Sequence, residues 1–126
     1  MTGFFGPLET LTVQNRFFRR VLFTGGHAQL VLMCLQPREE IGEEVHATVD
    51  QFFRVESGSA RVTFNKTEKR LVKAGSAFVV PAGTLHNVAN PSKDRPLHLY
   101  TIYSPPQHPD GTIHRTRAEA LAAEHH

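Results

Sequence analysis

The 126-residue sequence predicts a single all-β domain, a sandwich or a barrel, that ends in a short helix. Two observations favour this fold class. Short runs of β-branched and aromatic residues recur along the chain, and Gly, Pro, Asn and Asp residues separate them. Helical periodicity, in contrast, is nearly absent. A chain of this length buries roughly two-thirds of the surface that its unfolded state exposes, which is enough for one core.

The expected strands follow one another through the central part of the chain: residues 15–24, 29–36, 51–56, 60–64, 70–72, 77–80, 87–89 and 97–104. The residues between several of them suit tight turns. The Gly-Gly pair at 25–26, the Ser-Gly-Ser segment at 57–59 and the Asn-Lys-Thr segment at 65–67 each favour a hairpin. Several short strands at this spacing are typical of a sandwich or a barrel.

The two ends depart from this pattern on either side of the expected barrel at residues 15–104. Residues 1–14 alternate weakly, so we expect an N-terminal arm that is loosely ordered or paired with a neighbouring subunit. Residues 105–126 are expected to form an irregular loop and a short helix. Thr116, followed three residues later by Glu119, makes a capping box for that helix. The final pair, His125 and His126, is assigned no function.

Composition excludes several classes of protein. The formal charge is +2, with 40% apolar and 21% charged residues, as in ordinary soluble domains. We expect no nucleic-acid partner, and interpret the basic cluster of Arg16, Arg19 and Arg20 as a solvated strand end. The longest apolar run, residues 30–35, is too short to span a bilayer, and no signal peptide is expected. The single Cys34 excludes an internal disulfide, which favours a cytoplasmic protein.

Two polar clusters carry the candidate chemistry. Glu44 and His46 are two residues apart and project from the same face of an extended segment. A turn at 47–50 then places Gln51 on the next strand, on the same side as Phe53. In the second cluster, a Pro-Ala-Gly turn leads from one short strand to His86 near the start of another.

These clusters resemble the two sequence motifs of the cupin superfamily, small β-barrels that usually hold one divalent metal. The second motif matches throughout, at Gly75, Pro81, Gly83, His86 and Asn90. The first motif matches at its closing glycine, Gly58, but Glu44 stands where a histidine is common and Gln51 where a glutamate is common. The resemblance covers residues 40–104 and implies a double-stranded β-helix of the jelly-roll type.

The resemblance implies a metal site made of Glu44, His46, Gln51 and His86. Two imidazoles and one carboxylate suit Fe, Mn, Ni, Co or Zn, while the amide oxygen of Gln51 is a poor ligand. Gln51 alternatively lines the pocket and orients a substrate. A bound divalent ion would keep a charge of +1 in this set, which favours an anionic small molecule such as an enolate, a carboxylate or a sugar phosphate.

Three functions remain open on this basis. The first is catalysis by a metal-bound cupin, either a dioxygenase-like oxidation or a sugar isomerase or epimerase reaction. The second is a non-catalytic module that binds a small metabolite. The third is a metal-free cupin in which His46 and His86 act as acid and base. No Gly-x-Ser-x-Gly motif or glycine-rich phosphate loop occurs, so nothing indicates a serine nucleophile or a nucleotide site.

Other residues are placed less firmly. His98 and Tyr100 lie on one face of the last strand and Thr101 on the other, and the sequence does not decide which face looks inward. Tyr100 or Tyr103 could assist the metal ligands. The loop at 105–115, with His108 and His114, forms either a lid or an ordinary surface loop. Apolar residues Phe52, Phe4, Phe5, Phe17 and Phe18 supply outward surface, from which a homodimer is expected.

Overall fold

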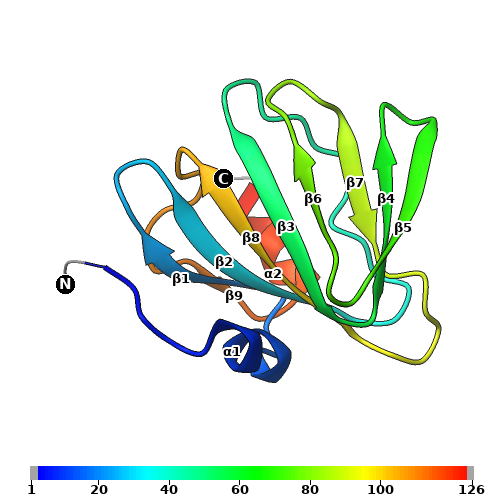
Figure 1. Cartoon of the computed structure of the whole chain (residues 1–126), viewed down its shortest axis with the longest axis horizontal. Helices are drawn as coiled ribbons and strands as arrows, with labels where there is room; N and C mark the ends of the chain where they lie inside the picture. The colour runs from blue at the N-terminus through cyan, green and yellow to red at the C-terminus, as the bar shows by residue number, and fades with distance from the viewer. Residues whose placement is uncertain (1–2, 125–126) are drawn as a thin grey trace.

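The computed structural model describes residues 3–124 and contains two antiparallel β-sheets and two short helices, α1 and α2 (Figure 1). The larger sheet has the strand order β6-β3-β8-β2-β1-β9, and the smaller has the order β5-β4-β7. The elements are α1 (Leu8–Gln14), β1 (Arg19–Thr24), β2 (Gln29–Leu35), β3 (Asp50–Ser57), β4 (Ser59–Phe64), β5 (Glu68–Lys73), β6 (Ala77–Val80), β7 (His86–Ala89), β8 (Leu97–Ser104), β9 (Ile113–His114) and α2 (Arg117–Glu124). The all-β prediction with a short C-terminal helix is confirmed.

The core lies between the two sheets and follows the two-residue period of their strands. On β8 the inward side chains begin with Leu97 and end with Tyr103, which settles the face that the sequence left open. On β3 the inward side chains are Gln51, Phe53 and Val55, as predicted. The Phe53 ring stacks on Phe78 of β6, with centroids 4.7 Å apart, which closes the core at this edge.

Helix α1 was not predicted, because residues 1–14 were interpreted as an arm. Its seven residues begin after Pro7, which supplies no side-chain cap, so the usual start signal is missing. An isolated helix of this length is unstable in water, and its stability must come from packing on the sheet. Thr12 is fully buried there and donates a hydrogen bond to the Leu8 carbonyl at 2.7 Å.

Two further differences from the prediction involve β1. The first strand begins at Arg19 rather than at residue 15, because Asn15 folds its side chain onto the backbone of Phe17 and makes a turn after α1. Strand β9 pairs with β1, so that His114 lies opposite Arg19. Two residues are too few to show a strand pattern in the sequence.

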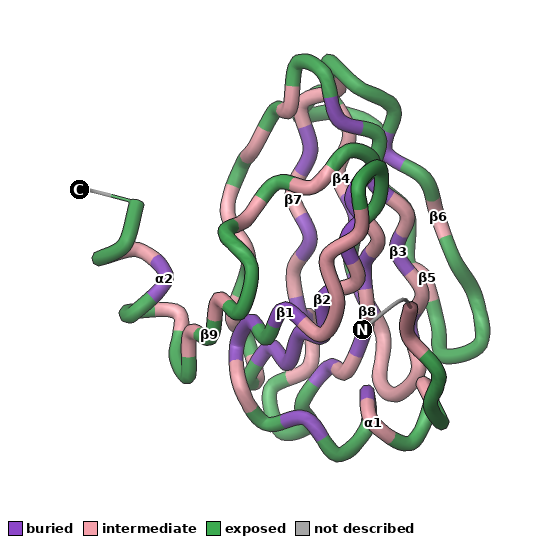
Figure 2. Tube along the Cα trace, turned by 90° about the vertical axis from the view of Figure 1, so that its left-hand side faces the viewer, coloured by how far each residue is buried: buried purple, intermediate pink, exposed green. Residues whose placement is uncertain are grey.

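The segment after β8 is fastened to the barrel. Gln29 is fully buried, and its side-chain oxygen accepts hydrogen bonds from the N–H groups of Gln107 and His108 at 3.1 and 3.0 Å. Its amide nitrogen donates to the His108 carbonyl at 2.8 Å. Helix α2 then lies to one side of the barrel, with Ala120 buried (Figure 2). The predicted threonine cap is confirmed, since the Glu119 N–H donates to the Thr116 hydroxyl at 3.1 Å.

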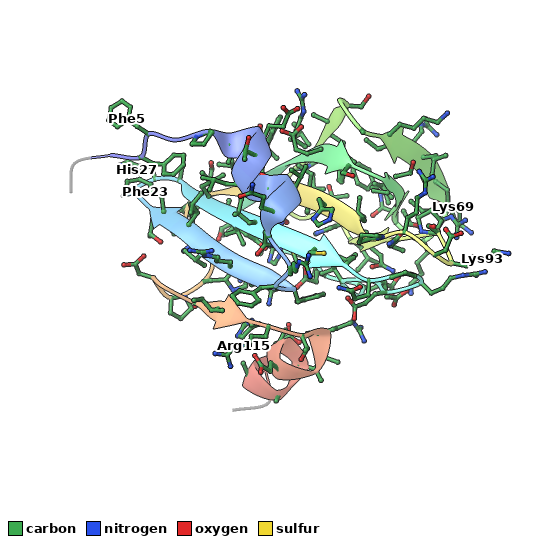
Figure 3. The ribbon with its side chains drawn as sticks, turned by 90° about the horizontal axis from the view of Figure 1, so that it is seen from below. Phe5, Phe23, His27, Lys69, Lys93 and Arg115 are labelled. Atoms are coloured by element: carbon green, nitrogen blue, oxygen red, sulfur yellow. The ribbon has the colours of Figure 1, made fainter. Side chains whose placement is uncertain are left out.

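The two ends of the molecule along its long axis carry different side chains (Figure 3). Phe5 is 94% exposed and projects at the end that also carries Phe23 and His27, whereas Lys69 and Lys93 lie at the opposite end. Phe18 is buried in the core, so the expectation that it contributes outward surface is wrong. No helix within residues 3–124 is both long enough and apolar enough to cross a membrane.

Gly58 joins β3 to β4 in a conformation that a side chain would disrupt. Its φ is 89°, and a Cβ atom there would lie 2.8 Å from the Pro96 carbonyl oxygen. We expect Gly58→Ala to lower the free energy of unfolding by about 2–3 kcal/mol, measured by urea denaturation. Gly75→Ala is the matched control, because its φ is 90° but no atom lies within 4 Å of the added carbon. Equal losses in the two variants would show that the contact with Pro96 costs nothing.

Candidate metal centre

Glu44 and His86 are held opposite each other by their backbones. The N–H of each residue donates to the carbonyl of the other, both at 2.9 Å, although Glu44 lies outside the named strands. Directly paired residues place their side chains on the same side of a sheet. The pairing therefore brings the carboxylate of the first sequence motif beside the imidazole of the second.

The Pro-Ala-Gly turn of the second motif positions the first motif as well. The N–H of Gly83 donates to the carbonyl of His46 at 2.8 Å. The neighbouring N–H of Ala82 donates to the Asp50 side chain, also at 2.8 Å. Gly83 has a φ of 83°, a conformation that favours glycine. The turn thus ties His46 to the start of β3, which carries Gln51.

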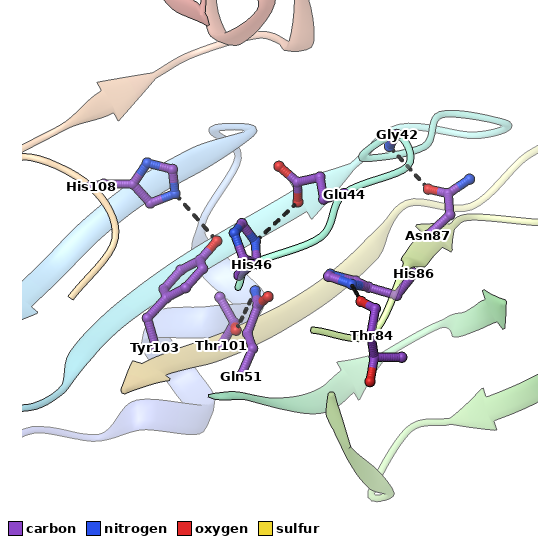
Figure 4. Close-up of polar contacts among 10 residues, drawn as sticks. All are labelled: Gly42, Glu44, His46, Gln51, Thr84, His86, Asn87, Thr101, Tyr103 and His108. Carbon is purple, nitrogen blue, oxygen red and sulfur yellow. Dashed lines mark hydrogen bonds and ion pairs between the residues drawn. The ribbon is translucent and has the colours of Figure 1, made fainter. Parts of the chain in front are cut away.

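Three ionisable side chains converge as a result (Figure 4). One ligand atom from each of Glu44, His46 and His86 lies within 4.8 Å of the other two. The His46 Nε2 atom is 3.8 Å from a Glu44 carboxylate oxygen, and the two imidazole centroids are 5.7 Å apart. His86 is buried, and the other two side chains are half-buried. This spacing would allow one small ion to contact all three.

The donor atoms that face this point lack partners within the protein. The Nε2 atoms of His46 and His86 and the side-chain oxygen of Gln51 are buried without a hydrogen bond among the described residues. Gln51 is 1% exposed, and its amide nitrogen donates to the Thr101 hydroxyl at 3.0 Å, so its oxygen is left free. Figure 4 shows this amide beneath His46.

The orientation of the His86 ring suits the same purpose. Its Nδ1 atom lies 2.9 Å from the Thr84 carbonyl oxygen, which can only accept, so Nδ1 carries the hydrogen. The lone pair of Nε2 then faces the other donors. A carbonyl partner that orients a histidine in this way is typical of metal ligands. The residues present therefore fit a divalent ion.

The carboxylate of Glu44 is ionised at neutral pH. Burial alone would raise the pKa of Glu44, but the nearby His46 imidazole, with the charges of Arg19 and His86, holds it below its usual value. The site thus offers one negative charge, two imidazoles and one amide oxygen. Carboxylate and imidazole ligands together suit first-row transition metals.

Three residues extend the site away from these candidate ligands. Tyr103 is buried, its ring meets that of His46 edge-on at 6.0 Å, and its hydroxyl lies 3.2 Å from His108 Nε2. Burial raises the pKa of Tyr103 far above its usual value, so the hydroxyl is neutral. Arg19 is the third residue, and its 2% exposure contradicts the interpretation as a solvated strand end. Its place in phase with buried Val21 on β1 was the signal that could have indicated an inward side chain.

The remaining candidates lie outside the site. His98 occupies the outer face of β8, opposite Cys34 on β2, so it does not join the metal ligands. Tyr100 lies on that same outer face, 6.2 Å from Phe52 between ring centroids. Cys34 is buried, and burial raises its pKa to about 11, so its thiol is unreactive. His27 is exposed.

His108 should make stability depend on pH. Burial, and then the positive charge of Arg19, lower its pKa to about 4, from an ordinary value of 6.5. As the pH falls, the unfolded chain binds a proton at His108 before the folded chain does. The free energy of unfolding is therefore highest above pH 6.5 and decreases between pH 6.5 and about pH 4. We expect this decrease in the free energy of unfolding to be on the order of 2–3 kcal/mol.

The measurement is urea denaturation of the parent and of His108→Gln at about pH 7.5 and about pH 4.5. The variant should lose less stability on acidification than the parent. His27→Gln, in the exposed turn after β1, is the control and should behave as the parent does. An identical loss in the parent and His108→Gln would show that His108 does not carry the effect.

Comparisons with known proteins identify the family of this chain. Residues 31–103 match a family model described as "Cupin domain". The uncharacterized protein YrkC of Bacillus subtilis (strain 168) is 51% identical over 122 residues, which are 93% of this chain and 65% of YrkC. An uncharacterized protein of Acanthamoeba polyphaga mimivirus is 44% identical over 111 residues, 86% of this chain and 69% of that protein. This chain therefore spans a little under two-thirds of the length of YrkC.

A solved structure agrees with the fold. The crystal structure of BH2720 from Bacillus halodurans superposes with a TM-score of 0.91 at 48% identity. The match covers 94% of this chain and 93% of that one. Nearly every element described above therefore has a counterpart in an experimental structure.

Proposed function

This chain belongs to the cupin family, and we propose that it holds one divalent metal ion and acts on a small anionic metabolite. Glu44, His46, Gln51 and His86 are the proposed ligands. The observation that carries the proposal is a set of three buried nitrogen and oxygen atoms that make no hydrogen bond within residues 3–124, two of them beside the Glu44 carboxylate. Leaving such atoms unpaired costs about 1–3 kcal/mol each, a cost that a bound ion would remove.

The ligand set limits which ions are expected. Two imidazoles and a carboxylate favour Fe, Mn, Ni, Co or Zn over Mg or Ca, which prefer all-oxygen sites. The amide oxygen of Gln51 carries no charge and should bind more weakly than a carboxylate would. A divalent ion would leave the site with a charge of +1, and this charge favours an anionic substrate.

The chain's own residues would prepare the reaction. When bound, the ion would act as a Lewis acid toward an oxygen of the substrate. Thr84 would hold the His86 ring in one orientation, and Thr101 would do the same for the Gln51 amide. Tyr103 would offer a neutral hydroxyl, and His108, 3.2 Å away, would remain neutral above about pH 4 and could exchange a proton with it.

Two reaction classes follow from these groups. A dioxygenase-like oxidation is favoured by the pairing of two histidines with one carboxylate. A sugar isomerase or epimerase is favoured by the contact between Tyr103 and His108, which could move a proton at a substrate carbon. The alternative is a non-catalytic module that binds a small metabolite, and the weak ligand Gln51 supports it.

The test begins with elemental analysis of the protein purified without added metal. Oxygen consumption is then measured with Fe(II) and a panel of small carboxylates, and isomerisation with sugar derivatives. Oxygen uptake would support the oxidation, and product formation without oxygen would support the isomerase. Thermal stabilisation by a metabolite without turnover would favour the binding module. A parent protein free of metal even after reconstitution would refute the metal-dependent function.

A cytoplasmic homodimer is also part of the proposal. The lone buried thiol of Cys34 supports a reducing compartment. Phe5 and the partly exposed Phe52 supply apolar surface on the outside of the barrel. Mass measurement at micromolar concentration tests the assembly, and a monomer alone would contradict it.

A further inference from the structure

Arg19 is a buried guanidinium that forms no ion pair with a carboxylate of residues 3–124. It is 2% exposed and points inward from β1. None of the ion pairs among residues 3–124 includes it. Its Nη1 atom donates to His114 Nδ1 at 3.2 Å, and its Nε atom has no partner in this part of the chain. A guanidinium cannot lose its charge in a protein, so burial without a counter-ion is strongly unfavourable.

The groups around Arg19 leave its charge uncompensated. Burial lowers the pKa of both His108 and His114, and it raises the pKa of Tyr103, so all three are neutral at neutral pH. Two rings connect Arg19 with the candidate metal ligands. Arg19 and His108 line one cavity, the His108 ring centroid is 5.1 Å from that of Tyr103, and the Tyr103 centroid is 6.0 Å from that of His46.

Space exists beside Arg19. A cavity of about 220 Å³ lies between β1, the 105–112 loop and α2, and Arg19, His108 and His114 line it. Glu124, at the exposed end of α2, also lines it, but not within ion-pair distance of Arg19. A planar guanidinium with a free donor is suited to hold a carboxylate through two parallel hydrogen bonds.

We propose that Arg19 binds the carboxylate of the substrate from this cavity, so that the preferred ligand is a small carboxylic acid. This inference rests on the proposed function, because it names the substrate class of the same site. The competing interpretation is structural, in which Arg19 only fastens β9 to β1 through His114. The substrate-binding and the structural interpretations differ in whether Arg19 is needed for anion binding.

The experiment uses protein stripped of metal with a chelator, so that anion binding is measured apart from metal binding. Pyruvate is titrated by calorimetry into the parent, Arg19→Met and Arg20→Met. Arg20 is the matched control, because it lies on the same strand but is exposed on the opposite face. The parent and Arg20→Met should bind pyruvate alike, and Arg19→Met at least about tenfold more weakly. Pyruvamide, which lacks the charge, should bind weakly to all three.

Two further variants keep the result interpretable. Arg19→Lys retains the charge without the planar fork and should lose part of the pyruvate affinity, which serves if Arg19→Met does not fold. Glu124→Gln should leave pyruvate binding unchanged or slightly stronger. Equal pyruvate affinity in the parent and Arg19→Met, no binding to the parent at millimolar pyruvate, or tighter binding of inorganic phosphate than of pyruvate would overturn the proposal. A protein that binds pyruvate through Arg19 but never takes up metal would refute the metal function alone.

Discussion

His86→Ala is expected to abolish stoichiometric binding of a divalent ion, with the dissociation constant rising by about 100-fold or more. The variant removes one of the two imidazoles, and with it the only ring whose orientation is fixed by a backbone carbonyl contact at Thr84. The remaining set of Glu44, His46 and Gln51 would contain a single nitrogen donor. Elemental analysis after purification and titration with Zn²⁺ or Fe²⁺ would measure the loss.

Thermal unfolding offers a second readout of the same change. A ligand that binds only the folded state stabilises it according to its concentration relative to its dissociation constant. A 100-fold weaker affinity should therefore remove about 2.7 kcal/mol of metal-induced stabilisation at saturating metal. The metal-free forms of parent and variant should differ much less.

His98→Ala is the control for this prediction. His98 is also an imidazole on a strand of the larger sheet, but it lies on the outer face beside α1 and away from the other ligands. Its removal should leave the metal content unchanged. If His86→Ala keeps the metal content of the parent, the ligand set proposed here is wrong.

The sequence could predict the strands, and could indicate the candidate ligand residues, because both depend on local patterns. The β6 and β8 bounds agree with the prediction, since alternation and turn residues act over a few positions. His86 follows a turn whose glycine needs a positive φ, a requirement visible in the sequence itself. The contact between Glu44 and His86 was foreseen only through the family resemblance, because it joins segments 42 residues apart.

Features that depend on distant contacts were missed. Arg19 is buried because β9 and the 105–112 loop cover it, and its phase with Val21 was a local hint of an inward side chain. Helix α1 had an indirect signal. Strand β2 is apolar at successive positions and not only at alternate ones, a pattern typical of a strand covered on both faces. Helix α1 covers the second face of β2, and it is stable only when it packs on the larger sheet.

Gln51→Glu should raise the affinity for a divalent metal by about tenfold or more while destabilising the metal-free protein. A carboxylate is a stronger ligand than an amide oxygen, and the ion would relieve its repulsion with Glu44. Without metal, a second negative charge would be buried at a position that is 1% exposed, at a cost of about 1–3 kcal/mol. The Thr101 hydroxyl could turn to donate to the new carboxylate, so the contact now made at 3.0 Å would be kept.

The two effects have opposite signs, which separates ligation from pocket lining. Urea denaturation of chelator-treated protein measures the loss, and metal titration measures the gain. Gln107→Glu makes the same chemical change at an exposed position and should alter neither quantity. If Gln51→Glu is destabilised but binds metal no more tightly, Gln51 lines the pocket without touching the ion. A stronger affinity would support a position of this side chain beside the ion, because a carboxylate there attracts the cation.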